Sequence, residues 1–167
     1  NRFARDQLLI SAVGDISEED LKEYLDTTFA ELPEKATPTG IKDAVLPKKG
    51  CEVIAPLNIP QGLVYFAQHG ISRDNPNFYA AYVLIKILGD GMFESRLWNE
   101  IREKRGLAYQ ISADLNWSQY SNLIIGQTAT KTANVKEVIT LLRKVWKDAI
   151  KGVTQAELDF VKRRMIG

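Results

Sequence analysis

Residues 88–109 read LGDGMFESRLWNEIREKRGLAY, and this stretch carries more information about the fold than any other part of the chain. The glycine-rich segment 89–91 predicts a break between two helices; it follows a helix and lacks the patterns of a phosphate-binding loop. A second helix is predicted from about 93 to 104. Three apolar residues mark its buried side: Leu97, Trp98 and Ile101. Gly106 predicts the end of that helix, because glycine readily adopts the left-handed backbone conformation that follows many helices.

The polar side of this predicted helix carries the candidate site residues. Ser95, Asn99 and Arg102 are spaced at i, i+4 and i+7, so an α-helix would place them on one face. Arg102 lies near the end of the helix and Tyr109 begins the next strand, so a guanidinium and a phenol can converge from adjacent elements. Such a pair can hold a peptide carbonyl and stabilise the negative charge that develops on its oxygen.

The residues alone leave a second interpretation open. Arg102 and Glu103 can simply form a solvated face of the helix. Tyr109 shares an alternating register with three apolar residues of its strand, Ile111, Ala113 and Leu115. That register places its ring in the core.

Hydrophobic periodicity along the rest of the chain predicts an α+β fold. Strands are predicted at 7–13, 52–57, 63–69, 108–115 and 122–129, the last two as a hairpin. Helices are predicted at about 17–29, 76–89, 93–104, 135–152 and 154–167. The strand at 63–69 is apolar on both faces and is expected to be central. This order favours a mostly antiparallel sheet with helices layered against it.

The domain organisation expected from the sequence is a single domain over residues 1–167. Prolines, a glycine and several lysines gather between about 33 and 50, which predicts a flexible connection there. The chain has no start methionine and enters a predicted strand almost at once, and its last predicted helix is still running at Gly167. Both ends are therefore expected to be truncated.

The composition excludes several classes of function. Lys and Arg total 22 against 21 Asp and Glu, so the net charge of +1 gives no indication of nucleic-acid binding. No apolar stretch approaches the roughly 20 residues of a membrane-spanning helix. His69 is the only histidine and Cys51 the only cysteine, so the chain cannot supply the ligands of a usual zinc site or a histidine-based catalytic triad. His69 is expected to be an ordinary residue at a strand end, and any enzymatic role must be shared with a partner.

The stretch 88–109 resembles the signature of the non-catalytic domain of M16 metallopeptidases, the pitrilysin, insulinase and mitochondrial-processing-peptidase group. The family pattern is Leu-Gly-x-Gly, Ser-Arg-Leu and then Arg-Glu-Lys-x-Gly-Leu-Ala-Tyr, and the chain carries each part. The resemblance extends to four further segments: 8–15, 26–33, 59–67 and 152–158. It therefore covers nearly the whole chain and implies an M16 (LuxS/MPP-like) fold.

The resemblance also implies a division of labour. M16 enzymes are clamshells whose N-terminal half holds zinc on an H-x-x-E-H helix, while the C-terminal half contributes an arginine and a tyrosine that contact the peptide. Those two residues match Arg102 and Tyr109, and the zinc ligands match nothing in this sequence. Zinc is thus expected in a partner, either an N-terminal catalytic M16 domain or a catalytic M16 subunit. A bacterial periplasm or cytoplasm and a mitochondrion are all compatible with the family.

Three functions follow, of which the first is favoured. The chain is expected to be the substrate-binding, non-zinc-binding domain of an M16-type zinc metalloendopeptidase, with Arg102 and Tyr109 binding peptide and stabilising the oxyanion. An alternative is a degenerate M16-like subunit with a structural role in assembly, like the core proteins of respiratory complexes. A third is a plain interaction domain with an exposed sheet.

Overall fold

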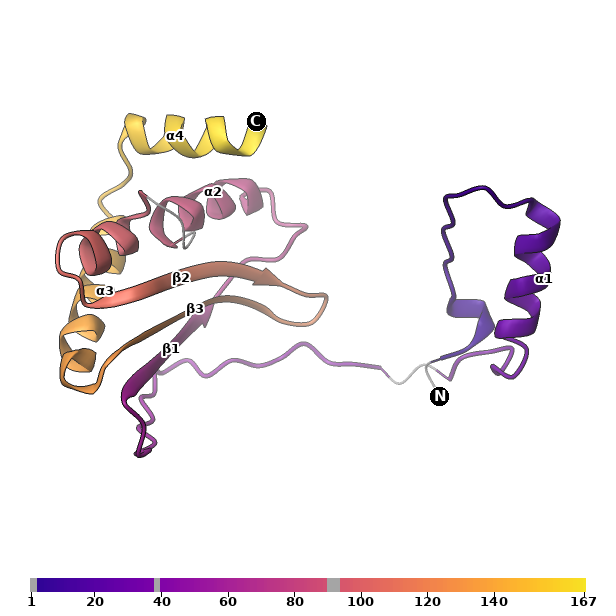
Figure 1. The fold of residues 1–167 in the computed structure, drawn as a ribbon, viewed down its shortest axis with the longest axis horizontal. Helices are drawn as coiled ribbons and strands as arrows, with labels where there is room; N and C mark the ends of the chain where they lie inside the picture. Colours follow the sequence, from indigo (N-terminus) through magenta and orange to yellow (C-terminus); the bar gives the residue numbers. More distant parts are fainter. Residues whose placement is uncertain (1–2, 38–39, 90–93) are drawn as a thin grey trace. The chain divides into compact units, whose positions relative to one another are not determined.

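The computed structural model describes residues 3–37, 40–89 and 94–167. The chain divides into two compact units, Asn1–Lys42 and Asp43–Gly167. Their boundary falls inside the connection predicted at about 33–50. The prediction of one domain over residues 1–167 stays a prediction. Figure 1 shows the elements in chain order.

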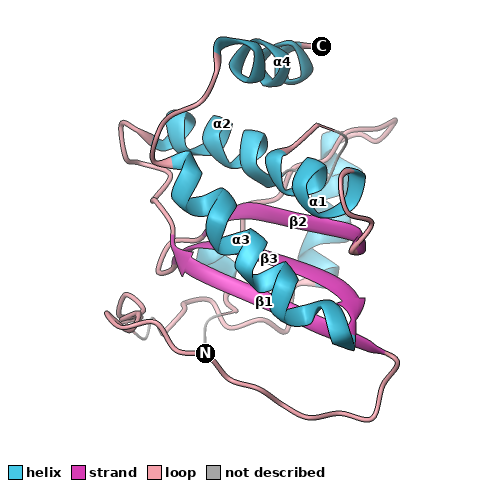
Figure 2. Ribbon diagram, turned by 90° about the vertical axis from the view of Figure 1, so that its left-hand side faces the viewer, coloured by secondary structure: helices cyan, strands magenta, loops and turns pink. Residues whose placement is uncertain are grey.

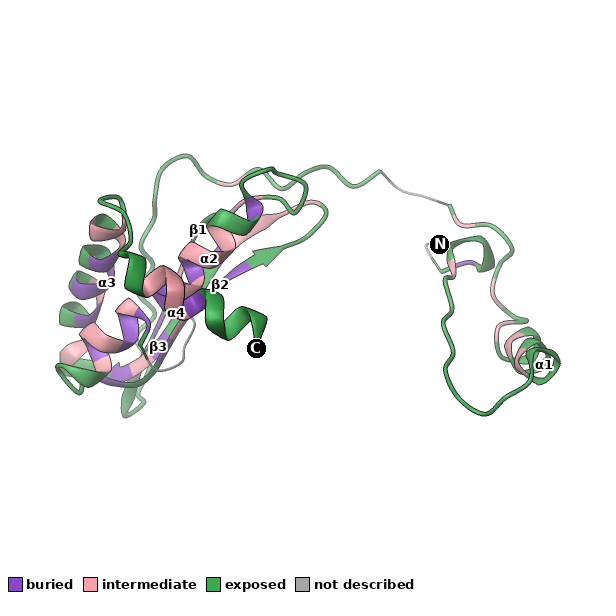
Figure 3. Cartoon of the chain, turned by 90° about the horizontal axis from the view of Figure 1, so that it is seen from above, coloured by how far each residue is buried: buried purple, intermediate pink, exposed green. Residues whose placement is uncertain are grey.

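The first unit contains the helix α1 (Glu18–Thr28) and a short 3-10 turn, η1 (Arg5–Gln7). Ser17 caps α1 as predicted: its Oγ accepts a hydrogen bond from the backbone N–H of Asp20 at 3.1 Å. Backbone N–H groups of η1 donate to carbonyls of the segment after α1, for example Arg5 to Pro33 at 2.9 Å. These hydrogen bonds connect the start of the unit to the chain after α1, and α1 itself has no buried residue (Figure 3).

The prediction of a strand at 7–13 is wrong. The chain between η1 and α1 forms no strand, and the side chains of Leu9 and Val13 are fully exposed. An apolar run becomes a strand only when a neighbouring strand accepts its hydrogen bonds, and no described segment pairs with it.

The second unit is built on an antiparallel sheet of three strands in the order β1-β3-β2, with β1 at Gln61–His69, β2 at Ala108–Trp117 and β3 at Asn122–Lys131. β2 and β3 form the predicted hairpin, and the sheet with its helices confirms the predicted α+β class. The central position predicted for 63–69 is wrong, because β3 pairs on both sides and β1 is an edge strand. β1 has apolar residues on both faces, but only one face is buried: Val64 lies in the core, whereas Leu63 and Tyr65 lie on the exposed face.

The strand predicted at 52–57 does not join this sheet either. Residues 51–59 run as extended chain without ladder partners among the described residues, and Val53, Ile54 and Leu57 are exposed. A strand at 52–57 could join this sheet beside β1, which is an edge strand. The segment does not do so, and the outer side of β1 has no partner among the described residues.

Three helices lie on one side of the sheet: α2 (Phe78–Gly89), α3 (Val135–Ala149) and α4 (Gln155–Ile166). Figure 2 shows α2 and α3 against the sheet, with α4 beyond α2. α2 packs on β2, α3 reaches β1 and β3, and α4 packs on α2. No helix among the described residues is long and apolar enough to cross a membrane.

The core lies between α2, α3 and the sheet. Its fully buried side chains include Phe78, Leu97, Ile101, Ile111 and Val138. α3 is buried on one side only, as its predicted amphipathic pattern requires (Figure 3). The predicted capping box of α4 is confirmed. α2 begins two residues after the predicted start, at Phe78, because Asn75 and the residues after it form a capping turn.

Candidate functional site

The helix predicted at 93–104 is a π-helix in its second half, the segment η2 (Trp98–Glu103); residue 93 lies outside the described residues. The backbone N–H of Lys104 donates to the carbonyl of Asn99, five residues earlier, at 3.0 Å. A π turn takes one more residue than an α turn, so residues beyond Asn99 are rotated relative to an α-helix. The prediction that Ser95, Asn99 and Arg102 share one face is therefore wrong: Ser95 and Asn99 line a cavity against α4, and Arg102 does not.

The buried side predicted for this helix is confirmed. Leu97, Trp98 and Ile101 are all buried. The helix ends where predicted, at Gly106 with φ +60°, and the N–H groups of Gly106 and Leu107 close its last turn. The chain is thereby directed from η2 into β2.

A β-bulge at the start of β2 brings Tyr109 to the surface. Ala108 lies opposite Thr130 and Ile111 lies opposite Thr128, so three steps along β2 match two along β3. The extra residue changes the alternation of faces. Ala108 and Ile111 are both buried, whereas Tyr109 is 82% exposed. The alternative that its ring belongs to the core is therefore wrong.

Two buried hydroxyl groups of β3 stabilise this bulge. Thr128 donates from its Oγ1 to the carbonyl of Gln110 at 2.7 Å, and Thr130 donates likewise to the carbonyl of Leu107. Both threonines are buried. They satisfy carbonyl groups that a regular ladder would have paired with backbone N–H groups.

Arg102 lies within cation–π distance of two aromatic rings. Its Cζ is 4.0 Å from the centroid of the Trp98 ring and 4.8 Å from the centroid of the Tyr109 ring. Within the described part of the chain its guanidinium forms no ion pair or side-chain hydrogen bond. The guanidinium therefore packs against both rings, and its N–H groups are available to an acceptor. The structure thus brings together the two residues predicted as a pair.

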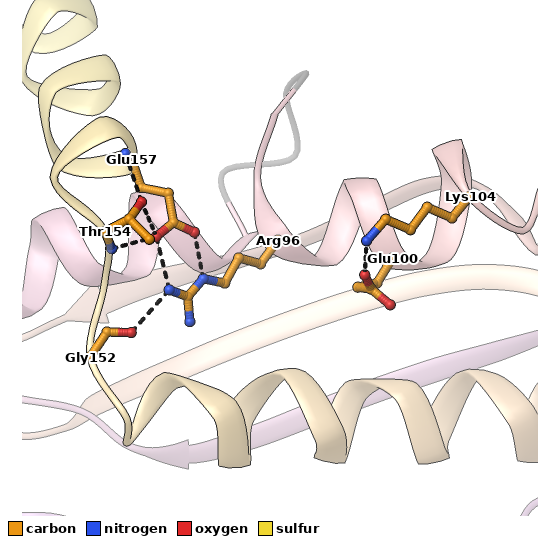
Figure 4. Close-up of polar contacts among 6 residues, drawn as sticks. All are labelled: Arg96, Glu100, Lys104, Gly152, Thr154 and Glu157. Carbon is orange, nitrogen blue, oxygen red and sulfur yellow. Dashed lines mark hydrogen bonds and ion pairs between the residues drawn. The ribbon is translucent and has the colours of Figure 1, made fainter.

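A second polar cluster, not predicted from the sequence, joins this helix to α4 (Figure 4). Arg96 donates from Nε to Oε1 of Glu157 at 2.6 Å and from a terminal nitrogen to Oε2 at 2.9 Å. It also donates to the carbonyl of Gly152 at 3.0 Å. Oε2 of Glu157 accepts from the backbone N–H of Thr154 at 2.7 Å as well. The bidentate ion pair fixes the start of α4 to the helix that contains Arg96.

The ion pair lowers the pKa of Glu157 from its usual 4.5 to about 2. The largest cause is the hydrogen bond from Arg96. Burial acts in the opposite direction, and the two hydrogen bonds from Thr154 lower the pKa further. Glu157 is therefore ionised in the folded protein throughout the neutral range.

We expect the ion pair to stabilise the protein above about pH 4.5 and to lose this contribution between about pH 4.5 and pH 2 as Glu157 is protonated. The pKa change corresponds to at most ~3 kcal/mol. With the two side chains 20% and 27% exposed, solvent screening reduces the contribution to ~1–2 kcal/mol. The free energy of unfolding of wild type and Glu157→Gln, measured against pH, should differ by this amount at pH 6 and converge near pH 2.

Glu137 provides the matched control, because it occupies the third position of α3 as Glu157 does in α4. Glu137 is exposed and has no ion pair among the described residues. Glu137→Gln should change the free energy of unfolding little at any pH. An equal loss in both glutamine variants would show that the Arg96 contact contributes nothing.

Between α2, α4 and the helix that contains Arg96 lies a cavity of about 320 Å³. Ser95, Asn99 and Arg96 line one wall, and Phe160 and Glu157 of α4 line another. Neither Arg102 nor Tyr109 lines it. The cavity and the Arg102–Tyr109 pair are thus separate features.

The residues present do not fit a zinc site. Among the described residues, no three His, Cys, Asp or Glu side chains are grouped so that they could hold a metal ion. His69 ends β1 opposite Leu123, and Cys51 is an exposed free thiol in the segment before β1. No step of metal chemistry is therefore assigned to this chain.

A comparison with known protein families shows which family the chain belongs to. The model of the peptidase M16 inactive domain matches residues 1–165. The chain belongs to this family. The resemblance inferred from the sequence is thereby confirmed, as is the M16 fold. The M16 inactive domain described here contains both Arg102 and Tyr109 within the matched residues.

The relatives and the solved structure that this M16 inactive domain matches are longer than the chain itself. It is 35% identical over 109 residues to the Non-peptidase homolog YmxG of Helicobacter pylori, covering 64% of this chain and 25% of that protein. It is 26% identical over 175 residues to the Uncharacterized zinc protease YmxG of Bacillus subtilis, covering 99% and 40%. The crystal structure of a peptidase M16 inactive domain from Pseudomonas fluorescens matches with a TM-score of 0.76 at 30% identity, covering 92% and 37%. The chain thus spans less than half the length of each.

Proposed function

We propose that this chain is the substrate-binding, non-zinc-binding part of an M16-type zinc metalloendopeptidase, in which Arg102 and Tyr109 bind the peptide and stabilise the oxyanion. The observation that carries the proposal is the state of Arg102. Its guanidinium packs against Trp98 and Tyr109, while its N–H groups have no acceptor among the described residues. A cation held in this way is ready to donate hydrogen bonds to an oxygen brought by a ligand.

The chemistry of the pair suits a peptide carbonyl. A guanidinium presents several N–H donors in one plane, and the exposed phenol of Tyr109 adds an O–H donor beside it. Hydrogen bonds to a carbonyl oxygen strengthen as that oxygen gains negative charge, so they stabilise the transition state more than the bound substrate. The exposure of Tyr109 leaves room for an extended chain to lie against the pair.

The metal in this proposal belongs to a partner. We propose that an N-terminal catalytic M16 domain, or a catalytic M16 subunit, holds the zinc and supplies the general base; the zinc would activate the water that attacks the peptide. When such a partner covers the pair and excludes water, the attraction between Arg102 and a developing oxyanion increases, because the local dielectric falls.

The metal prediction can be tested on the chain itself. Because one histidine and one cysteine cannot build a usual zinc site, we expect only substoichiometric zinc after purification and dialysis, measured by elemental analysis. One tightly bound zinc ion per chain would contradict the division of labour proposed above. A protein of similar size with an H-x-x-E-H helix serves as the positive control.

A degenerate subunit with a role in assembly is the second candidate. It is favoured by the name of the Helicobacter relative, a non-peptidase homolog. The two candidates differ in one measurable property. The full-length protein, alone and together with any M16 subunit encoded beside it, is assayed for cleavage of a quenched-fluorescent peptide mixture with and without a zinc chelator. Chelator-sensitive cleavage supports the peptidase, and no cleavage in any combination supports the assembly subunit.

A further inference from the structure

We propose that Trp98 is a positioning residue, which holds the guanidinium plane of Arg102 toward the peptide, and that Glu103 holds Trp98 by accepting its indole proton. This inference rests on the proposed function of Arg102. It adds two residues to the site: Trp98, which is predicted on the buried side of the helix, and Glu103, which the alternative interpretation places on a solvated face.

The contacts give Trp98 this role. Its ring lies 4.0 Å from the Cζ of Arg102, closer than the ring of Tyr109 at 4.8 Å. Trp98 is buried and packed in the core side of η2, whereas Tyr109 is largely exposed. The indole of Trp98 is thus the more rigid of the two rings, and the guanidinium of Arg102 packs against it.

Glu103 fixes the indole in its plane. The Nε1–H of Trp98 donates to Oε1 of Glu103 at 2.9 Å, across a span of five residues. Both residues lie within the π turn of Trp98–Glu103. The carboxylate is therefore engaged by the indole and not by Arg102, although Arg102 is its neighbour in the chain. Among the described residues this arrangement leaves Arg102 without an acidic partner, which would otherwise compete with a substrate oxygen.

Holding the guanidinium in advance has an energetic consequence. A free arginine side chain has considerable rotamer entropy, and much of it is lost when the side chain binds a ligand. A stacked arginine has lost much of that freedom before the substrate arrives, so more of each hydrogen bond appears as binding or as stabilisation of the transition state. Removing the stack should therefore weaken the action of Arg102 without touching the substrate.

The test is a double-mutant cycle in the full-length protein with its catalytic partner, read as kcat/KM for a quenched-fluorescent peptide. Trp98→Leu should lower kcat/KM ~10-fold, because the stack is lost, and Trp98→Phe less than ~3-fold, because an aromatic face remains. In the Arg102→Ala background neither substitution should lower kcat/KM further. A merely structural role of Trp98 would lower it equally in both backgrounds, and that additive result would overturn the proposal.

Glu103 and a second tryptophan keep the test decisive if Trp98→Leu folds poorly. Glu103→Leu should lower kcat/KM ~3-fold with Arg102 present and not without it, whereas Glu103→Gln retains an acceptor and should stay near wild type. Trp146 is the matched control, since its Nε1–H also donates to a side-chain oxygen, that of Gln68, at 2.9 Å. Trp146→Phe should leave kcat/KM unchanged.

The outcomes separate this inference from the function on which it rests. If Arg102→Ala itself leaves cleavage unchanged, the proposed function fails, and with it the positioning role. If Arg102→Ala lowers cleavage but the Trp98 and Glu103 variants are neutral, only the positioning role is overturned. If the assembled protein does not cleave, the peptidase role fails, and the same cycle is measured on the Kd of a fluorescein-labelled peptide: a loss that depends on Arg102 supports positioning for peptide binding alone, and an additive loss overturns it.

Discussion

Arg102→Ala is expected to lower kcat/KM for peptide cleavage by the assembled enzyme ~100-fold, the usual loss when one donor to a developing oxyanion is removed. Alanine deletes the guanidinium whose N–H edge has no acceptor among the described residues. The loss should appear mainly in kcat if the hydrogen bonds form chiefly in the transition state, and in KM if they only hold the substrate. Steady-state kinetics with a quenched-fluorescent peptide separates the two.

Lys104→Ala is the matched control for this prediction. It removes the same charge two residues away and, among the described residues, breaks an ion pair with Glu100, shown in Figure 4, that is exposed on the lysine side. Such pairs contribute little to stability, so kcat/KM should stay within ~2-fold of wild type. Equal losses in both variants would indicate a general effect of charge, and an unchanged kcat/KM for Arg102→Ala would refute the proposed role.

Tyr109→Phe should lower kcat/KM less than Arg102→Ala does, because a neutral hydrogen-bond donor contributes less than a charged one. The same steady-state assay measures this difference.

The site could be predicted from the sequence only as far as local spacing reaches. Arg102 and Tyr109 are seven residues apart on either side of Gly106, and a helix end followed by a strand brings them together. The exposure of Tyr109 could not be predicted, since the bulge that turns it outward depends on pairing with β3 and on the hydroxyl groups of Thr128 and Thr130. The π turn could not be predicted either, because nothing in the pattern of apolar and polar residues distinguishes it from an α turn.

The prediction of the fold from the sequence is limited in the same way, by contacts between residues that are far apart in the chain. The helices α1, α3 and α4 were predicted well, because caps and apolar periodicity are local signals. The runs at 7–13 and 52–57 have equally strong strand patterns, yet neither finds a partner among the described residues. Arg96 and Glu157 are 61 residues apart, so no spacing rule could have paired them. The local sequence pattern predicts that a segment is able to form a strand. The strand forms only when a neighbouring strand pairs with it.

Gly89 shows how a residue predicted as a helix break has a packing role that the sequence does not reveal. It is the last residue of α2 and is buried against β2. A Cβ added there would lie 2.6 Å from the Cβ and 2.9 Å from the backbone nitrogen of Ala113, and 3.1 Å from Cδ1 of Leu97. Ala113 belongs to the ladder with β3 and cannot move away without breaking it. The absence of a side chain at Gly89 therefore lets α2 approach β2 closely.

Gly89→Ala is expected to lower the free energy of unfolding by ~2 kcal/mol. Two effects oppose each other: alanine favours a helix over glycine by up to ~1 kcal/mol, whereas forcing a methyl group into a packed core costs ~1–3 kcal/mol or more. The packing cost should win, because the nearest neighbours include backbone and not the flexible end of a side chain. Urea unfolding followed by tryptophan fluorescence measures the change, since all three tryptophans, Trp98, Trp117 and Trp146, lie in the second unit.

Two further variants make the origin of this loss testable. Gly50→Ala is the control, because a Cβ there meets nothing within 4 Å, and it should change stability by less than ~0.5 kcal/mol. Ala113→Gly removes the closest atom, so it should cost less in the Gly89→Ala background than in wild type. A stabilised Gly89→Ala would mean that helix propensity outweighs the clash. Because β2 carries Tyr109 and Leu97 leads into the turn that carries Arg102, the close approach at Gly89 supports both elements on which the pair depends.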